Sequence, residues 1–278
     1  MENNISWHMN FNLREFITKS IADFEKERSI SAMWKAPLTA VLSAEHPLIP
    51  ELKQAVSPDP AAEEQCATQA HLLPNELLPD AKSIFVFFIP FADWIVESNI
   101  KGEAVSEEWA RAYIFTNDLL GFINNEIEKY LNLQGFQAAK IMATVTFDKN
   151  TLMSRWSHRH IARIAGLGSF GLNNMLITSA GCCGRFGSIV TNLEPGPNAD
   201  MPSAIPDKCL HKLNGSCGFC LKKCKSGAIG KDRKFNRHKC YEICLKNAEI
   251  YKPMGMADVC GKCLVGLPCS SRDPSGVF

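Results

Sequence analysis

The cysteine content of the last seventy residues most constrains what this chain can fold into. Nine of the twelve cysteines of the 278-residue chain lie between Cys209 and the C-terminus. Thiolates are soft ligands that suit iron–sulfur clusters or zinc, and a [4Fe–4S] cluster needs four of them. A bound metal group is therefore expected to organise this segment. The cysteines are spaced as Cys209-x7-Cys217-x2-Cys220-x3-Cys224, then Cys240 and Cys244, then Cys260-x2-Cys263-x5-Cys269.

This spacing predicts a module with two [4Fe–4S] clusters. In two-cluster ferredoxins, three closely spaced cysteines hold one cluster, and a cysteine from elsewhere in the sequence completes it. Two structural zinc sites are the alternative, but the run from Cys217 to Cys224 is more typical of ferredoxins than of zinc knuckles. Cys244 is left over. The predicted ligand sets are Cys209, Cys217, Cys220 and Cys269 for one cluster, and Cys224, Cys240, Cys260 and Cys263 for the other.

Composition and charge describe the chain as a whole. A hydrophobic content of 46% and a net charge of +1 are typical of a globular protein, and they argue against a disordered chain or a polycationic nucleic-acid binder. The N-terminus lacks a secretory pattern, and no apolar run reaches the roughly 18–20 residues of a membrane span. Because cysteines in such a chain indicate metal or redox chemistry rather than disulfides, we expect a cytoplasmic protein without a membrane partner.

Helix and strand patterns precede the cysteine module. Residues 83–90 form an apolar run that ends in proline, as in a strand buried on both faces. Ser106 is a candidate N-cap for a long helix that Gly135 would end. Prolines divide residues 29–82 into short helices and loops. Other patterns predict an amphipathic helix from Leu13 to Phe24, a helix over 157–165, and strands over 138–146, 174–178 and 186–193.

The change in composition near residue 200 predicts two domains. Residues 194–206 contain four prolines and little periodicity, which is typical of a linker. We expect an α/β domain over residues 1–205, followed by a small ferredoxin-like domain over 206–278. The second domain is basic, with ten Lys and Arg residues against Asp207 and Asp232 over 207–239. These cations either compensate the clusters' negative charge, the interpretation we favour, or form a docking surface for an acidic electron donor.

A glycine-rich segment precedes the linker. Gly166-x-Gly168-x-x-Gly171 matches the dinucleotide-binding fingerprint, but that motif follows a strand and opens a helix. A predicted helix comes before it here, so Gly166 is expected to end that helix. The glycines allow close approach of the backbone to another element or to a large flat ligand. The neighbouring pair Cys182–Cys183 lies in a glycine-rich turn and is interpreted as structural.

Three segments together resemble a known family. They are residues 165–178 with the glycine motif, residues 185–191, and the cysteine array. In these segments the chain resembles the epoxyqueuosine reductase-like iron–sulfur proteins, and it looks closest to a short branch without the tRNA-binding C-terminal region. Reductive dehalogenases share the same plan of a catalytic body followed by two clusters.

The resemblance implies a fold, cofactors and contact residues. It implies a nitroreductase-like α+β domain that binds cobalamin base-off, in line with the absence of the Asp-x-His-x-x-Gly motif, and two [4Fe–4S] clusters that reduce it. The corrinoid would then contact Gly166, Gly168, Ser169, Phe170, Gly171, Leu172 and Asn173.

The chain departs from that family in two places. It stops nine residues after Cys269, so we do not expect tRNA to be the substrate. The family's acidic proton donor is also missing from residues 152–158. Asp148 is the nearest acid, and Arg155, His158 or His160 are the other candidates for the catalytic role.

The leading hypothesis is a cobalamin-dependent iron–sulfur oxidoreductase. A low-potential donor such as ferredoxin or flavodoxin would supply electrons, and the substrate would be a small molecule or a corrinoid protein. One alternative is an electron-transfer or activator protein that reduces a partner corrinoid protein. The other is an iron–sulfur reductase that contains FMN, because nitroreductase-like folds commonly hold that cofactor.

Overall fold

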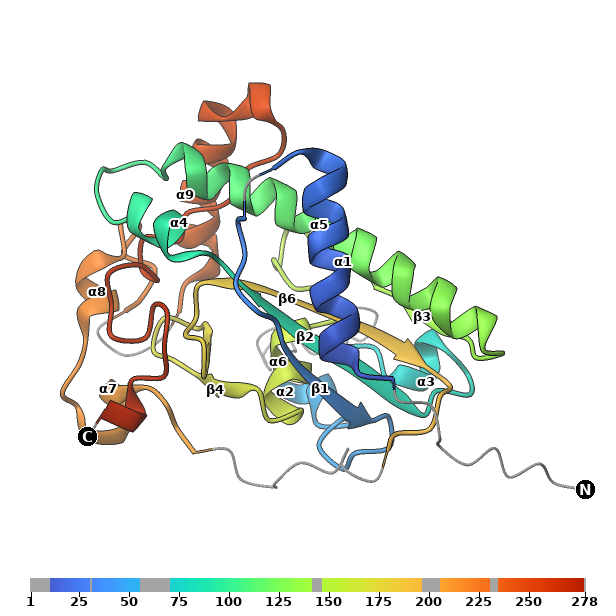
Figure 1. The fold of residues 1–278 in the computed structure, drawn as a ribbon. Helices are drawn as coiled ribbons and strands as arrows, with labels where there is room; N and C mark the ends of the chain where they lie inside the picture. Colours follow the sequence, from blue (N-terminus) through green and yellow to red (C-terminus); the bar gives the residue numbers. More distant parts are fainter. Residues whose placement is uncertain are drawn as a thin grey trace, which may run out of the picture.

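A four-stranded antiparallel sheet forms the centre of the body (Figure 1). The computed structural model describes residues 11–30, 32–55, 71–141, 147–196, 206–230 and 235–277. The strand order is β1-β2-β6-β3, and β4 and β5 form a separate two-stranded sheet. The strands are β1 Leu38–Ser43, β2 Ser83–Pro90, β3 Ala138–Lys140, β4 Gly168–Phe170, β5 Leu176–Thr178 and β6 Gly184–Thr191.

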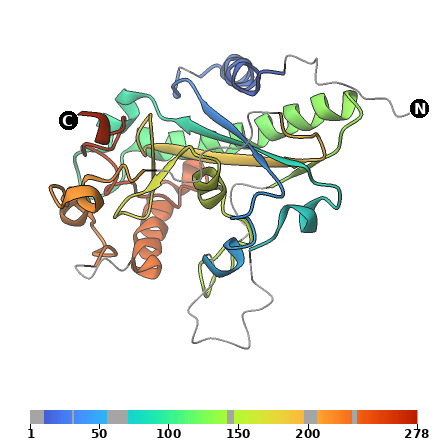
Figure 2. The same ribbon diagram turned by 90° about the horizontal axis from the view of Figure 1, so that it is seen from below.

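Strand β2 divides two hydrophobic cores, and its predicted range is confirmed. All eight of its residues are buried. Phe85, Phe87 and Ile89 pack in one core with helices α1 Leu13–Arg28 and α5 Glu107–Leu133. The alternate residues, including Val86 and Phe88, pack in the other core with α6 His158–Ile164. Helices α1 and α6 therefore cover opposite faces of the sheet (Figure 2).

The predicted helix starts have the expected caps. The Ser106 side chain accepts a hydrogen bond from the Trp109 N–H at 3.2 Å, which satisfies a free amide in the first turn of α5. Ser157 caps α6 in the same way. Among the described residues, no helix combines the length and apolar character needed to cross a membrane. The remaining helices of the body are α2 Leu52–Ala55, α3 Pro74–Leu77 and α4 Asp93–Ser98.

Strand β1 is the main error of the sequence-based prediction, which expected only short helices and loops over residues 29–82. β1 is an edge strand, and five of its six residues are only half-buried, so it has no continuous apolar run. Its pairing with β2, from Leu38 opposite Phe88 to Ser43 opposite Ser83, fixes it. Strand β3 accounts for the start of the strand predicted over 138–146, and residues 142–146 lie outside the described residues.

The cysteine module packs directly on the body beside α4 and the first turns of α5 (Figure 1). Its helices are α7 Leu210–Asn214, α8 Phe219–Lys223 and α9 Arg237–Ile250, with 3₁₀ turns η2 Lys252–Met254 and η3 Ser275–Val277. Buried Ala257, Leu264 and Val265 belong to the same core as α1 and α5. The structure thus shows a mixed α/β fold in which body and module share a core.

The sheet packing predicts the effect of a mutation in β2. Phe87 is fully buried, so Phe87→Ala should lower the free energy of unfolding by about 3–5 kcal/mol through lost contacts and a cavity. Leu133, at the end of α5, is 83% exposed, and Leu133→Ala should change it by less than about 0.5 kcal/mol. Denaturant unfolding followed by circular dichroism measures both. Equal effects of the two substitutions would contradict the central place of β2.

Candidate iron–sulfur centre and ligand cleft

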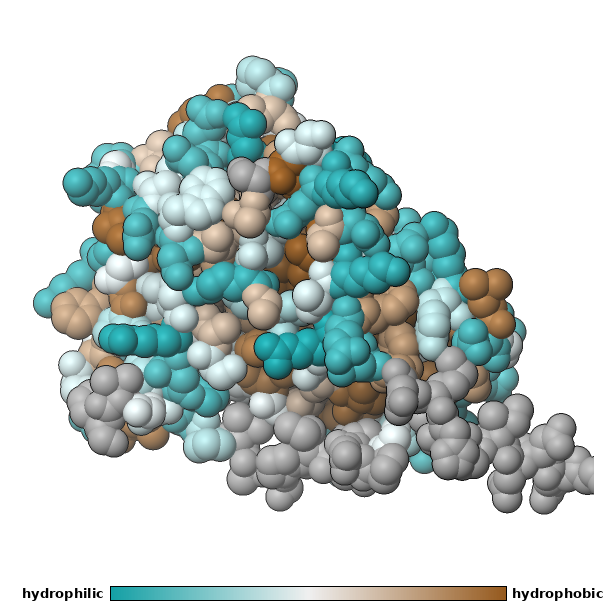
Figure 3. All heavy atoms as spheres, in the orientation of Figure 1, coloured by the Kyte–Doolittle hydropathy of each residue, from teal (hydrophilic) through white to brown (hydrophobic). Residues whose placement is uncertain are grey.

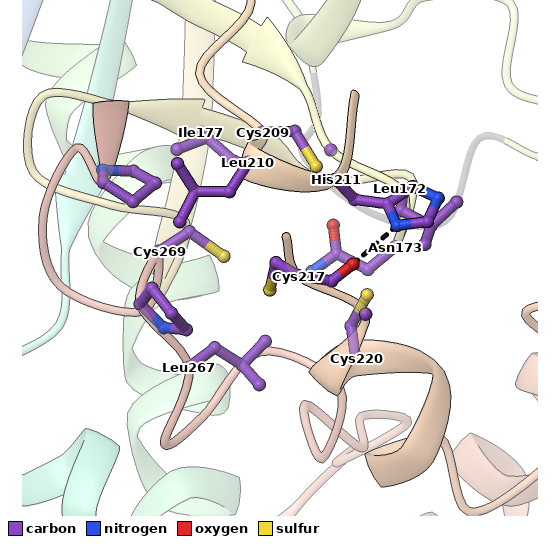
Figure 4. Close-up of a pocket in the computed structure, with 14 residues that line it drawn as sticks. Leu172, Asn173, Ile177, Cys209, Leu210, His211, Cys217, Cys220, Leu267 and Cys269 are labelled. Atoms are coloured by element: carbon purple, nitrogen blue, oxygen red, sulfur yellow. Dashed lines mark hydrogen bonds between the residues drawn. The ribbon is translucent and has the colours of Figure 1, made fainter. Parts of the chain in front are cut away.

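The four predicted ligands of the first cluster surround one hollow (Figure 4). Cys209 is the N-cap of α7, Cys220 lies in α8, and Cys217 and Cys269 lie in loops. All four side chains direct their sulfur atoms toward the same space. Apolar side chains of Ile177, Leu210 and Leu267 complete the wall. The structure therefore brings together the crossed set that combines three neighbouring cysteines with a distant fourth.

A turn of the body holds the loop that carries Cys269. The Cys182 N–H donates to the Cys269 carbonyl at 3.0 Å, and the Cys183 N–H donates to the Ser270 carbonyl at 3.1 Å. Gly181, just before the pair, has φ +82°, and a Cβ there would lie 2.4 Å from the Ser270 carbonyl oxygen. Only glycine fits so close to the loop. Both cysteines are buried, in line with the structural role predicted for them.

The second predicted set lines a larger cleft between module and body. Cys224, Cys240, Cys260 and Cys263 all contribute to its wall, and its cavity volume is about 620 Å³. Burial raises the pKa of the Cys263 thiol, and the other three cysteines of the set raise it further. Thiols that influence one another in this way lie within electrostatic reach. The structure therefore groups this set as well.

Cys244 also lies in this cleft, one helical turn after Cys240 on the same face of α9. A hydrogen bond to Cys244 lowers the pKa of the Cys240 thiol to about 7. The cysteine left over by the spacing thus lies beside the second ligand set.

The donor chemistry of both sites fits [4Fe–4S] clusters. The eleven described cysteines are all free thiols. Within the described ranges, no group of three or more His, Cys, Asp or Glu side chains could hold a metal ion. Four thiols in each predicted set are the donor set that a [4Fe–4S] cluster takes.

Two of the four predicted catalytic residues lie in the cleft. His158 and His160 line it, whereas Asp148 and Arg155 are absent from its wall. The Asp148 carboxylate accepts hydrogen bonds from the Asn150 and Thr151 N–H groups at 2.9 and 2.7 Å within a turn. Arg155 is exposed. The position of these two residues does not support direct contact with a ligand in the cleft.

The two histidines are held by serine hydroxyls. Ser188 Oγ lies 2.7 Å from His158 Nδ1 and accepts from Trp156 Nε1 at 3.0 Å, so its own hydrogen is available to His158. Ser157 Oγ lies 2.7 Å from His160 Nδ1. Burial lowers the pKa of His160 to about 4, and the neighbouring Arg159 charge acts in the same direction. His160 is therefore neutral near pH 7.

The glycine segment faces the first hollow more than the cleft. Gly166 follows the end of α6, and its N–H donates to the Arg163 carbonyl, as expected of a helix stop. At Gly168 a Cβ would lie 2.2 Å from the Ile177 carbonyl oxygen, so the close approach there is to strand β5. Gly171, Leu172 and Asn173 line the hollow, and Asn173 alone of the seven predicted contact residues also lines the cleft.

The two remaining members of that segment make contacts within the protein. The hydroxyl of Ser169 accepts from the Lys208 N–H at 2.7 Å and ties the start of the module to β4. The Phe170 ring packs against His160, with 4.7 Å between ring centroids.

The sequence-based prediction missed an ionisable group of side chains in the cleft. The Tyr113 hydroxyl donates to Asp258 Oδ1 at 2.8 Å, and the Arg185 guanidinium lies 4.4 Å from the centre of the Tyr113 ring. Burial raises the pKa of Tyr113. A Tyr–Asp pair of this kind can hold a proton beside a bound ligand. No local motif signals it, because Tyr113, Arg185 and Asp258 come from α5, β6 and a cluster loop.

Comparison with known proteins gives matches at the level of structure. No protein-family model and no curated protein sequence matches the chain. A selenomethionine-labelled epoxyqueuosine reductase is 19% identical, with a TM-score of 0.50 over 95% of this chain and 71% of that one. The chain has the epoxyqueuosine reductase fold. The enzyme from Bacillus subtilis, with its catalytic loop swung out of the active site, is 18% identical, with a TM-score of 0.51 over 95% and 70% of the two chains.

A second group shares the epoxyqueuosine reductase fold. A catabolic reductive dehalogenase is 16% identical, with a TM-score of 0.54 over 85% of this chain and 30% of that one. The predicted resemblance to epoxyqueuosine reductases and reductive dehalogenases is therefore confirmed for the fold. The finer descriptions of the two parts, nitroreductase-like and ferredoxin-like, remain predictions.

The grouping of the cysteines predicts the iron content of variants. Cys269→Ser and Cys240→Ser should each lose about half of the iron, because each removes a ligand of one cluster only. Cys244→Ser, one turn from Cys240, is the matched control and should keep all of it. Iron per chain and the electron paramagnetic resonance spectrum of anaerobically purified protein measure both effects. Iron loss in Cys244→Ser with full iron in Cys240→Ser would reassign the fourth ligand.

The environment of His160 predicts a dependence of stability on pH. Its pKa in the folded protein is about 4, below the usual 6.5, so the unfolded chain binds a proton first as the pH falls. Stability should drop by at most about 3 kcal/mol between pH 6.5 and pH 4 from this residue. In urea unfolding measured at both pH values, His160→Gln should remove this loss of stability. The control His238→Gln, at an exposed site, should retain it. Identical pH profiles for His160→Gln and the wild type would contradict this.

Proposed function

We propose that the chain is an iron–sulfur oxidoreductase that uses cobalamin bound in the cleft. The observation that carries the proposal is the composition of the cleft wall. One side comes from the body, with residues 156–160 and 173–175, and the other contains every cysteine of the second predicted set. A ligand in the cleft would contact the body and lie directly against the second cluster. That arrangement suits electron transfer between the second cluster and the ligand.

The two ligand sets form a route from the surface to the cleft. Asn173 lines both the hollow of the first set and the cleft, and its Nδ2 donates to the Cys263 carbonyl at 3.1 Å. The first set lies around α7 and α8, where Lys212 and Lys222 are exposed. An acidic low-potential donor such as a ferredoxin or flavodoxin would find complementary charge there. Electrons would enter at the first cluster and leave at the second.

The cleft has the size of a ligand site, and its wall includes aromatic side chains. Its volume of about 620 Å³ lies within the usual range of about 300–1,000 Å³ for cofactor and ligand sites. Trp156, His158, Asn174 and Met175 would hold the corrinoid on the body side. When bound, that cofactor supplies the redox chemistry of its cobalt, while the protein orients it and excludes water. His158 and the Tyr113–Asp258 pair are the ionisable groups placed to hold a proton there.

Two other functions are compatible with the same fold. An activator that reduces a partner corrinoid protein needs only a surface near the second cluster, and the presence of a cleft favours a bound ligand instead. A reductase that contains FMN would use the cleft in the same way as the cobalamin enzyme. Which of the two cofactors the protein binds therefore distinguishes the cobalamin enzyme from the FMN reductase.

Anaerobic reconstitution tests the proposal. Protein with full iron content should bind cobalamin at micromolar concentration, and its visible spectrum should change to that of the base-off form. FMN added in parallel should remain unbound after gel filtration. No cobalamin binding by cluster-loaded protein would refute the proposal, and a retained flavin spectrum would favour the FMN reductase.

A further inference from the structure

Three arginine side chains meet in the cleft from three separate elements. Arg159 comes from α6, Arg185 from β6 and Arg237 from the first turn of α9. All three side chains line the same cleft. Burial lowers the pKa of Arg159, and the charges of Arg185 and Arg237 lower it further, so each of these two groups lies within electrostatic reach of Arg159. Like charges gathered in a half-buried place are unfavourable unless a counter-charge joins them.

No described carboxylate supplies that counter-charge. None of the three arginines forms an ion pair with any Asp or Glu within the ranges that the structure describes. Asp258 is the one acidic residue among those lining the cleft, and it already accepts a hydrogen bond from Tyr113. No carboxylate in the described part of the chain therefore forms an ion pair with the arginine cluster.

The hydrogen-bond donors of the cluster are only partly used, although the Arg185 side chain forms a hydrogen bond with Tyr113. Arg185 Nη1 is buried and has no hydrogen-bond partner among the described residues. Arg159 Nη1 donates to the Asn174 carbonyl at 2.6 Å and contacts Met175 Sδ. Arg237 Nη1 contacts another sulfur atom, Sδ of Met153. Buried donors without partners cost free energy, so a ligand that accepts from them would be strongly favoured.

The negative charge of the second cluster does not account for the whole group. Arg159 and Lys262 line the cleft together with the predicted ligands Cys240 and Cys260, so these two cations are available to the second cluster. Lys262 is fixed there by the Asn99 and Lys101 carbonyls at 3.0 and 2.7 Å. Arg185 instead lies over the Tyr113 ring, on the side of the body.

We propose that Arg159, Arg185 and Arg237 bind a phosphate group of the ligand that occupies the cleft. Planar guanidinium groups donate paired hydrogen bonds that match the oxygen geometry of phosphate, and three of them can surround a single tetrahedral anion. This inference rests on the proposed function, since it names the chemistry that the same cleft recognises. The phosphate belongs either to the nucleotide tail of the corrinoid or to the substrate.

Binding of inorganic phosphate to cluster-loaded protein without corrinoid tests the site. Isothermal titration calorimetry should detect phosphate binding by the wild type. Arg185→Gln and Arg237→Gln should each weaken it about tenfold or more, as expected when a charged hydrogen-bond donor is lost. Arg163→Gln is the matched control, because Arg163 lies on α6 one turn after Arg159 but is exposed. Arg185→Lys, which keeps the charge and loses the planar donor pair, should fall between wild type and Arg185→Gln.

Corrinoid binding then identifies the source of the phosphate. Cobalamin carries the nucleotide phosphate and cobinamide lacks it. If Arg185→Gln weakens cobalamin binding and leaves cobinamide binding unchanged, the phosphate is that of the cofactor. If both corrinoids bind all variants equally and cobalamin-loaded protein still binds phosphate, the phosphate belongs to the substrate.

The outcomes that refute each idea differ. Phosphate affinity equal to wild type in both Gln variants, with iron content and circular dichroism unchanged, would overturn the arginine site whatever the protein does with cobalamin. Phosphate binding that depends on Arg185 and Arg237 without any cobalamin binding would support the arginine site. The same result would refute only the proposal that cobalamin is the cofactor.

Discussion

The attachment of one cysteine loop to the body positions everything else in the site. Residues 260–269 carry predicted ligands of both clusters, and three separate parts of the body hold them. Asn99 Nδ2 donates to the Cys260 carbonyl at 3.0 Å, Asn173 Nδ2 to the Cys263 carbonyl, and the Cys182 N–H to the Cys269 carbonyl. Buried Leu264 and Val265 place the same loop in the main core. Movement of this loop would displace both ligand sets together.

The distribution of charge in the cleft follows from that attachment. The residues just before this loop bring Asp258 to Tyr113, and the other charged groups of the cleft are mostly cationic. Low water access strengthens interactions among these groups, as the lowered pKa of His160 and the raised pKa of Tyr113 both indicate. A cleft of this kind favours anionic groups.

Local patterns predicted the parts of the chain whose structure depends on neighbours in sequence. The apolar run of β2 and the Ser106 cap of α5 each contain their own signal, and both were predicted correctly. Strand β1 has no such signal, because pairing with β2 is what stabilises it. Asp148 was considered because it is the acid nearest to residues 152–158, but its carboxylate accepts hydrogen bonds within a local turn. Arg185 and Asp258 are separated by more than seventy residues and could not be connected by spacing.

The sequence by itself determined the number and order of the cysteines, and with them the prediction of two four-thiol sites. Cluster ligation depends on residue type and spacing, which a sequence states directly. Only the tertiary structure decided that the second site opens on a cleft, that Cys244 lies beside it, and that three arginines meet there. Those facts depend on how α6, β6 and α9 pack against one another, and packing is a property of the whole fold.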